Sequence, residues 1–119
     1  MILGLDHVQL AIPIGGEDQA RAFYQGVLGL IEVSKPGDMA ARGGCWFEQG
    51  AVKVHIGVEA DYRPAKKAHP AFVVADLDAL TAVLRQGGWV VNPDSELPDY
   101  RRIFTEDPFG NRIELMQRV

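Results

Sequence analysis

Residues 100–116 read YRRIFTEDPFGNRIELM and predict a β-hairpin. The segment 107–110, Asp-Pro-Phe-Gly, has the residues of a tight turn, and it separates strand segments 100–105 and 111–116. Because successive side chains of a strand point to opposite faces, Glu114 lies on the face opposite the aliphatic residues. The hairpin therefore ends in a strand that carries a carboxylate on its polar face.

A second hairpin is predicted in the first half of the chain. Residues 41–48 and 52–58 alternate like strands and are joined by the turn Gln49-Gly50. In the second of these strands, His55 lies on the face opposite the valines and isoleucine. His55 in Val-His-Ile and Glu114 in Ile-Glu-Leu thus occupy equivalent places in the two hairpins.

The elements that precede each hairpin also repeat. The first half predicts a strand, a helix and three strands, at residues 5–12, 17–28, 30–33, 41–48 and 52–58. The second half predicts the same order, with Asp76 as helix cap, at residues 69–74, 77–84, 89–91, 100–105 and 111–116. We expect an α+β fold of two tandem βαβββ modules, residues 1–59 and 68–119, within one domain, residues 1–119. Neither module of about 55 residues buries enough apolar surface alone, so they share a core or pair with a second chain.

Composition excludes several classes of function. The net charge of −4 argues against a nucleic-acid partner, which usually needs a basic face. No apolar run approaches the roughly 18 residues of a membrane span, and no secretory signal is recognisable, so we expect a cytoplasmic protein without a membrane partner. The single Cys45 cannot form an internal disulfide or build a structural zinc site alone. Any metal must be held by histidine and carboxylate.

Four residues are candidate metal ligands: His7, His55, His69 and Glu114. The three histidines are the only ones in the chain, and each is predicted on a strand, on the face opposite the aliphatic one. A single such histidine is usually a surface residue, but here His7 and His69 open equivalent strands, as His55 and Glu114 occupy equivalent later ones. Imidazole and carboxylate suit Zn, Ni, Mn or Fe(II), and such a set leaves positions open for a substrate.

The chain resembles the vicinal-oxygen-chelate superfamily, which includes glyoxalases, bleomycin-resistance proteins, fosfomycin-inactivating transferases and extradiol dioxygenases. The segments that carry the resemblance span nearly the whole sequence: LDHVQLAIP (5–13), RAFYQGVLGL (21–30), KAHPAFVVADLDAL (67–80) and DPFGNRIELMQ (107–117). The resemblance implies a cup-shaped, eight-stranded, half-open barrel with its helices outside. It also implies a homodimer whose site can draw ligands from two chains.

The resemblance implies His7, His69 and Glu114 as metal ligands. Glyoxalases place a fourth ligand, usually Glu, where this sequence has His55, so His55 alters the group that moves protons. The catalytic candidates are therefore Glu114 and His55. The function implied is that of a divalent-metal-dependent lyase or isomerase of glyoxalase type, acting on a small molecule that chelates the metal through neighbouring oxygens. Alternatives are a fosfomycin-type thiol transferase, a non-catalytic antibiotic-sequestering protein and, less favoured because those chains are longer, a dioxygenase.

Four further residues are candidates for the substrate pocket. Gln9 follows His7 by two residues and lies on the same strand face. Trp46 and Phe104 are aromatic strand residues suited to walls. Arg102, with its neighbours Tyr100 and Arg101, is a candidate for the anion-binding role that the transferases require.

Overall fold

The structure, a computed structural model, describes residues 1–95 and 97–119. The chain divides into two units, unit 1 from Met1 to Arg63 and unit 2 from Pro64 to Val119. Among the described residues, no helix has the length and apolar character that crossing a bilayer requires.

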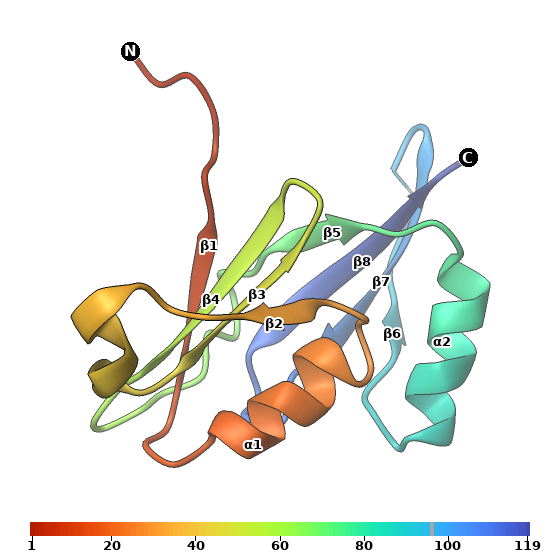
Figure 1. The fold of residues 1–119 in the computed structure, drawn as a ribbon. Helices are drawn as coiled ribbons and strands as arrows, with labels where there is room; N and C mark the ends of the chain where they lie inside the picture. The colour runs from red at the N-terminus through yellow and green to blue at the C-terminus, as the bar shows by residue number, and fades with distance from the viewer. Residues whose placement is uncertain (96) are drawn as a thin grey trace. The chain divides into compact units, whose positions relative to one another are not determined.

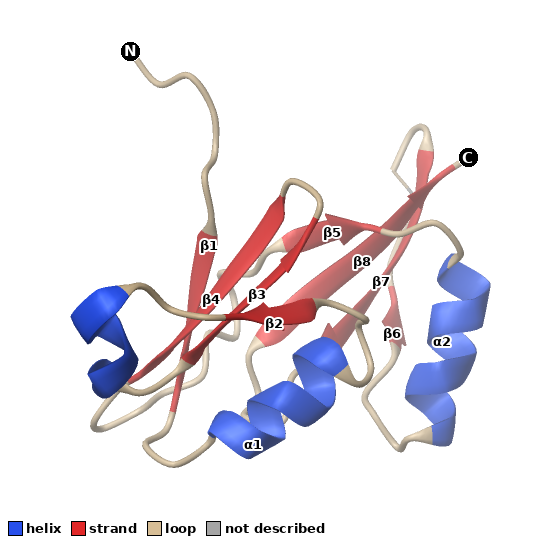
Figure 2. Ribbon diagram, viewed as in Figure 1, coloured by secondary structure: helices blue, strands red, loops and turns tan. Residues whose placement is uncertain are grey.

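Unit 1 contains a four-stranded mixed sheet in the order β1-β4-β3-β2 (Figures 1 and 2). β1 runs parallel to β4, whereas the other neighbours are antiparallel. Its elements, in chain order, are β1 (Val8–Ile12), α1 (Glu17–Ala20), the π-helical η1 (Arg21–Gln25), β2 (Ile31–Val33), the 3-10 helix η2 (Gly37–Arg42), β3 (Cys45–Gln49) and β4 (Val52–Val58).

Unit 2 repeats this arrangement with the strand order β5-β8-β7-β6, and β5 again runs parallel to β8. Its elements are β5 (Ala71–Val73), α2 (Leu77–Gln86), β6 (Asn92–Pro93), β7 (Tyr100–Glu106) and β8 (Arg112–Arg118). The predicted α+β class and the twofold order of strand, helix and three strands are confirmed. That residues 1–119 form one domain stays a prediction.

Helices in both units contribute apolar side chains to the core. Phe23 and Tyr24 of η1 are fully buried, and the Tyr24 ring lies 5.9 Å from the Phe47 ring of β3. In unit 2, α2 buries Leu77 and Leu84. The helices are thus held by apolar packing, which is the dominant favourable contribution to folding.

The helix predicted over residues 17–28 is not a regular α-helix. After α1 the backbone changes to π-type hydrogen bonds, in which Gly26 N donates to Arg21 O at 3.1 Å and Leu28 N donates to Phe23 O at 2.9 Å. The 3.6-residue period of the apolar positions does not distinguish these two kinds of helix, because both bury Phe23 and Tyr24.

Two predicted strands begin earlier in the sequence than the observed ones. The chain at residues 41–44 completes η2 and passes through Gly43 and Gly44, which have φ values of 75° and 81°, so β3 begins only at Cys45. Residues 89–91 form no strand, because Trp89 N still donates to Leu84 O at the end of α2. The strand expected there is displaced to β6.

The predicted strands that open each half are also shorter than expected, and this moves two histidines. His7 directly precedes β1, and His69 lies two residues before β5. The expectation that every histidine sits in a strand is therefore wrong for His7 and His69. Pro70 gives one physical reason: it lacks an N–H and cannot donate to a β-ladder, although its carbonyl accepts from Glu114 N at 3.0 Å.

Candidate metal-binding residues and adjoining cavities

In unit 1, the sheet brings His7 and His55 into ring contact. Their centroids are 4.1 Å apart, and the Trp46 ring stacks on His55 at 3.8 Å with an interplanar angle of 1°. The register explains this arrangement, because Trp46 and Gln9 are the cross-strand partners of His55 from its two neighbouring strands. Two candidate ligands and one predicted pocket residue therefore form a single aromatic stack.

The surroundings of this stack orient His7 and lower the pKa of His55. His7 Nδ1 lies 2.9 Å from Asp6 Oδ2, an acceptor that orients the ring and leaves Nε2 available. His55 is 7% exposed, and burial, with the neighbouring His7 as a second cause, lowers its pKa below the usual value. A neutral histidine is the form that binds a metal ion.

A cavity of about 310 Å³ adjoins the stack, and Gln9, Trp46 and His55 are among its lining residues. The Gln9 side chain lies across Gly57, where a Cβ atom would stand 2.5 Å from Gln9 Nε2. The absence of a side chain at residue 57 thus lets Gln9 lie flat on the sheet face that carries His55.

In unit 2, His69 and Glu114 form the corresponding pair. Ala71, two residues after His69, is the cross-strand partner of Glu114. In the same way, Gln9, two residues after His7, is the cross-strand partner of His55. Phe104 pairs with Glu114 from β7, and its ring meets that of His69 edge-to-face at 5.1 Å. The two pairs of candidate ligands therefore occupy the same register positions in their respective sheets.

The hydrogen bonds of His69 define its tautomer. Nδ1 lies 2.9 Å from the carbonyl oxygen of Lys67, which can only accept, so Nδ1 carries a hydrogen. In a neutral ring Nε2 then has a lone pair, and Nε2 lies 3.0 Å from Glu114 Oε1. Two acceptors at this distance require a proton or a cation that both can bind.

The carboxylate of Glu114 is buried, with 5% of the residue exposed, and its second oxygen has a cationic neighbour. Arg102 Nη1 lies 3.6 Å from Glu114 Oε2, while the same guanidinium lies 3.7 Å from Asp94 and donates to Ser95 O at 3.0 Å. Arg102 therefore holds one oxygen of Glu114 in place and leaves the other directed at His69.

Tyr100 and Arg101, the predicted neighbours of Arg102, are engaged elsewhere. Arg101 Nη1 donates to Asp78 at 3.3 Å, and the Tyr100 hydroxyl accepts from Arg118 at 2.8 Å. Sequence reasoning missed Asp6 and Arg112. Their positions are the signal that could have identified them, since Asp6 adjoins His7 and Arg112 precedes Glu114 by two residues.

In neither unit, over the described residues, do three or more His, Cys, Asp or Glu side chains form a group suited to a metal ion. Each unit by itself supplies a pair of donors: two imidazoles in unit 1, and an imidazole and a carboxylate in unit 2.

Sequence comparison gives the class of protein to which this fold and these residues belong. Residues 4–115 match the Glyoxalase/Bleomycin resistance protein/Dioxygenase superfamily, and the chain belongs to that family. A crystal structure of a protein described as a glyoxalase family member from Bacillus anthracis is 48% identical. That comparison covers 100% of this chain and 98% of the other, with a TM-score of 0.94.

More distant solved structures share the fold. The fosfomycin resistance protein FosX from Listeria monocytogenes, solved with Mn(II) and a sulfate ion, is 20% identical over 100% of this chain and 93% of that one, with a TM-score of 0.79. TnmS3, an antibiotic binding protein from Streptomyces sp. CB03234, is 22% identical over 99% and 100% of the two chains, with a TM-score of 0.73. No curated protein matches the sequence significantly.

Proposed function

We propose that the protein is a divalent-metal-dependent enzyme of glyoxalase type, whose small substrate chelates the metal through two neighbouring oxygens. His7, His55, His69 and Glu114 would hold the ion, which is Zn, Ni, Mn or Fe. Nitrogen and carboxylate oxygen donors suit these metals. When bound, the ion supplies Lewis acidity that stabilises negative charge on a substrate oxygen. The Mn(II) complex of FosX is a precedent within the superfamily.

The observation that carries this proposal is the contact between His69 Nε2 and Glu114 Oε1. These atoms lie 3.0 Å apart, although the His69 tautomer makes both of them acceptors. A divalent cation bound to both would remove this conflict, and so would a proton. Arg102 Nη1, 3.6 Å from Oε2, helps to hold the carboxylate with Oε1 directed at His69, as a metal ligand would need to be.

The pair in unit 1 supports the same conclusion by its donor chemistry. The Asp6 carboxylate contacts His7 Nδ1 and leaves Nε2 as the nitrogen that can bind a metal, and burial lowers the pKa of His55, which favours its neutral, metal-binding form. We assign the movement of protons during the reaction to the two buried members of the set, His55 and Glu114.

The remaining predicted residues have roles that follow from their contacts. Gln9 and Trp46 line the cavity beside His55 and would contact the substrate there. Phe104 adjoins His69 and would exclude water, while Arg102 positions the Glu114 carboxylate.

An alternative is a non-catalytic protein that binds and sequesters a small molecule. The aromatic stack of His7, His55 and Trp46 beside a cavity of about 310 Å³ favours this reading, because a flat apolar wall can hold a planar ligand without a metal. TnmS3, which shares the fold, is described as an antibiotic binding protein. A thiol transferase acting on fosfomycin, the antibiotic to which FosX confers resistance, is the other alternative.

The first test is the metal content of the purified protein and its variants. We expect about one Zn, Ni, Mn or Fe per site in the wild type and loss of that metal in His69→Ala and Glu114→Ala. Glu59→Gln, which removes an exposed carboxylate, is the control and should keep the metal. Equal, weak binding by all four proteins would overturn the proposal.

Substrates then separate the alternatives. Wild type, loaded with each metal, would be assayed with a methylglyoxal–glutathione adduct, with fosfomycin plus thiols, and with catechols under oxygen. Metal-dependent turnover of the adduct supports the glyoxalase assignment, and turnover of fosfomycin supports the transferase. Metal-independent binding without turnover supports sequestration.

A complementation experiment tests the expected homodimer. One double variant, His7→Ala with His55→Ala, lacks the donors of unit 1, and another, His69→Ala with Glu114→Ala, lacks those of unit 2. If donors come from two copies of the chain, co-expression of the two variants restores metal binding to mixed dimers. If all donors come from one chain, no mixture restores it.

A further inference from the structure

Arg112 occupies a position in unit 2 that the repeat pairs with Lys53 in unit 1. Each lies two residues before the strand ligand, and each faces a glutamate across the hairpin, Glu106 for Arg112 and Glu48 for Lys53. The surroundings of the two cations differ, however. Lys53 Nζ lies 3.7 Å from Asp6, the residue before the first histidine.

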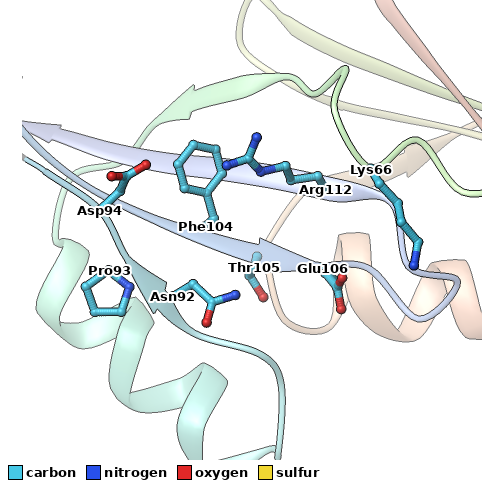
Figure 3. Close-up of a pocket in the computed structure, with 8 residues that line it drawn as sticks. All are labelled: Lys66, Asn92, Pro93, Asp94, Phe104, Thr105, Glu106 and Arg112. Carbon is cyan, nitrogen blue, oxygen red and sulfur yellow. The ribbon is translucent and has the colours of Figure 1, made fainter.

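The residue before His69 is Ala68, so Arg112 has no equivalent of that carboxylate. Nor does it pair with Glu106: among the described residues, Arg112 forms no ion pair. Its guanidinium lies over the Phe104 ring instead, at 3.7 Å from the centroid (Figure 3). A cation–π contact to the ring face does not use the N–H groups of the guanidinium as donors to an oxygen, so they can bind an anion.

This guanidinium lines a cavity of about 310 Å³ in unit 2, together with Lys66, Asn92, Phe104 and two carboxylates (Figure 3). One carboxylate, Asp94, is already engaged, since it accepts from Ser95 N at 2.7 Å and lies 3.7 Å from Arg102. Among the described lining residues, the carboxylate of Glu106 has no side-chain partner, whereas that of Asp94 is shared between Ser95 and Arg102.

We propose that this cavity is an anion subsite, in which the N–H edge of Arg112 binds a carboxylate, phosphate or phosphonate group of the substrate. The inference rests on the proposed function for its connection to the reaction. Arg112 and Glu114 project from the same face of β8, two residues apart, and their cross-strand partners are Glu106 and Phe104. The substrate class is thus a small molecule that carries an anionic group in addition to its metal-chelating oxygens.

The geometry assigns the specificity to the arginine fork rather than to charge alone. A guanidinium donates two parallel hydrogen bonds to a carboxylate or phosphate, whereas an ammonium group binds as a point charge. Glu106 has the opposite effect, because its charge repels an anion in the same cavity. Removal of the Glu106 charge should therefore strengthen anion binding, whereas removal of the Arg112 charge should weaken it.

The test is a titration of the purified protein with inorganic phosphate, methylphosphonate and acetate, followed by the NMR signals of the arginine Nε–H groups and the Phe104 ring. We expect Arg112→Gln to weaken binding of at least one of these anions by about tenfold, as loss of a charge-assisted hydrogen bond predicts. Arg112→Lys should recover only part of the affinity. Arg85→Gln, which removes the same charge from an exposed position at the end of α2, should leave affinity unchanged.

Glu106→Gln tests whether the Glu106 carboxylate repels the anion or takes part in binding it. Tighter binding of the anions supports the proposal, whereas weaker binding would show that Glu106 takes part in binding and would overturn it in this form. Equal affinity of wild type and Arg112→Gln for every probe would also overturn it.

Metal content, measured on the same samples, keeps the two hypotheses separate. Arg112→Gln should retain the metal while losing the anion, and His69→Ala should do the reverse. Loss of the metal with retained anion binding is therefore the expected result for His69→Ala. The same result in Arg112→Gln would contradict the independence of the anion subsite from the metal ligands.

Discussion

Units 1 and 2 place their candidate ligands at the same register positions but surround them with different chemistry. In unit 1, His7 and His55 belong to an aromatic stack that ends on Trp46. In unit 2, Glu114 lies between an imidazole and the guanidinium of Arg102. The backbone ladder thus determines where each candidate ligand lies, and the side chains around it determine its contacts.

The two hairpins that carry the strand ligands are closed by different devices. Asp107 Oδ1 accepts from the backbone N–H groups of Phe109 and Asn111, and Oδ2 accepts from Asn111 Nδ2 at 2.8 Å. The turn of unit 1 relies on Gly50, with φ at 58°, after an exposed Gln49. A buried carboxylate therefore closes one turn, and backbone conformation closes the other.

The largest expected effect comes from the turn of unit 2. Asp107→Ala removes an acceptor that is 4% exposed and leaves its donors without that partner, so we expect a loss of about 3 kcal/mol in the free energy of unfolding. Gln49→Ala should change it by less than about 0.5 kcal/mol. Urea denaturation of both variants checks the difference, and equal losses would show that the two turns are closed alike.

Much of this asymmetry could be predicted from the sequence. The residues Asp-Pro-Phe-Gly predicted the turn, and alternation predicted β4, β7 and β8 with their polar faces. Such signals are local, because they depend on residues adjacent in the chain. They predict His55 and Glu114 on the strand faces opposite the aliphatic residues.

Contacts between distant segments could not be predicted in this way. The stack of Trp46 on His55 depends on the register of β3 against β4, which a periodic pattern does not specify to one residue. The engagement of Arg102 with Asp94 and Glu114 depends on the path of the chain before β7. Arg112 was missed for the same reason, since its lack of a carboxylate partner is a property of the folded unit.

Arg102 provides the second prediction, which concerns the charged surroundings of Glu114. Arg102→Gln should lower metal affinity about tenfold, as loss of a partner that orients a ligand typically does. Arg102→Lys should give a smaller loss, because it keeps the charge but not the planar fork. Trp46→Leu in unit 1 removes only a ring contact to His55 and should have the smallest effect. Isothermal titration with the metal ranks the three, and an effect of Trp46→Leu larger than that of Arg102→Gln would reverse the comparison.

The two units also differ in the side chains that cap the first turns of their helices, and this difference should affect the free energy of unfolding. The Asp76 side chain accepts from Ala79 N at 3.0 Å, and Gln117 accepts from Leu77 N, whereas the first helix has no side-chain cap at Gly16. Asp76→Ala should cost about 1 kcal/mol in the free energy of unfolding. Gln117→Ala should cost a comparable amount, and thermal denaturation of the single and double variants measures both. Losses that do not exceed about 0.3 kcal/mol would show that tertiary packing alone determines where this helix begins.

The smallest expected effect belongs to unit 1 and depends on pH. Glu17 Oε2 accepts from the backbone N–H of Gly44 at 3.0 Å, and this bond is the main cause that lowers the pKa of the Glu17 carboxyl below its usual value. A carboxyl whose folded pKa is lowered stabilises the fold above its unfolded pKa, near 4.5, and this contribution disappears as the pH falls through the lowered value. Because the group is largely in contact with solvent, the contribution should stay under about 1 kcal/mol.

Glu17→Gln should therefore lower stability slightly at pH 7 and flatten its decline between about pH 5 and pH 3. Glu59→Gln, which removes an exposed carboxylate from the same unit, should leave that decline unchanged. Urea midpoints across this range provide the measurement. If Glu17→Gln and wild type declined in parallel, the bond to Gly44 would not hold the loop before β3 against α1 by charge. The loop before β3 would then depend, like the turn at Gly50, on backbone conformation alone.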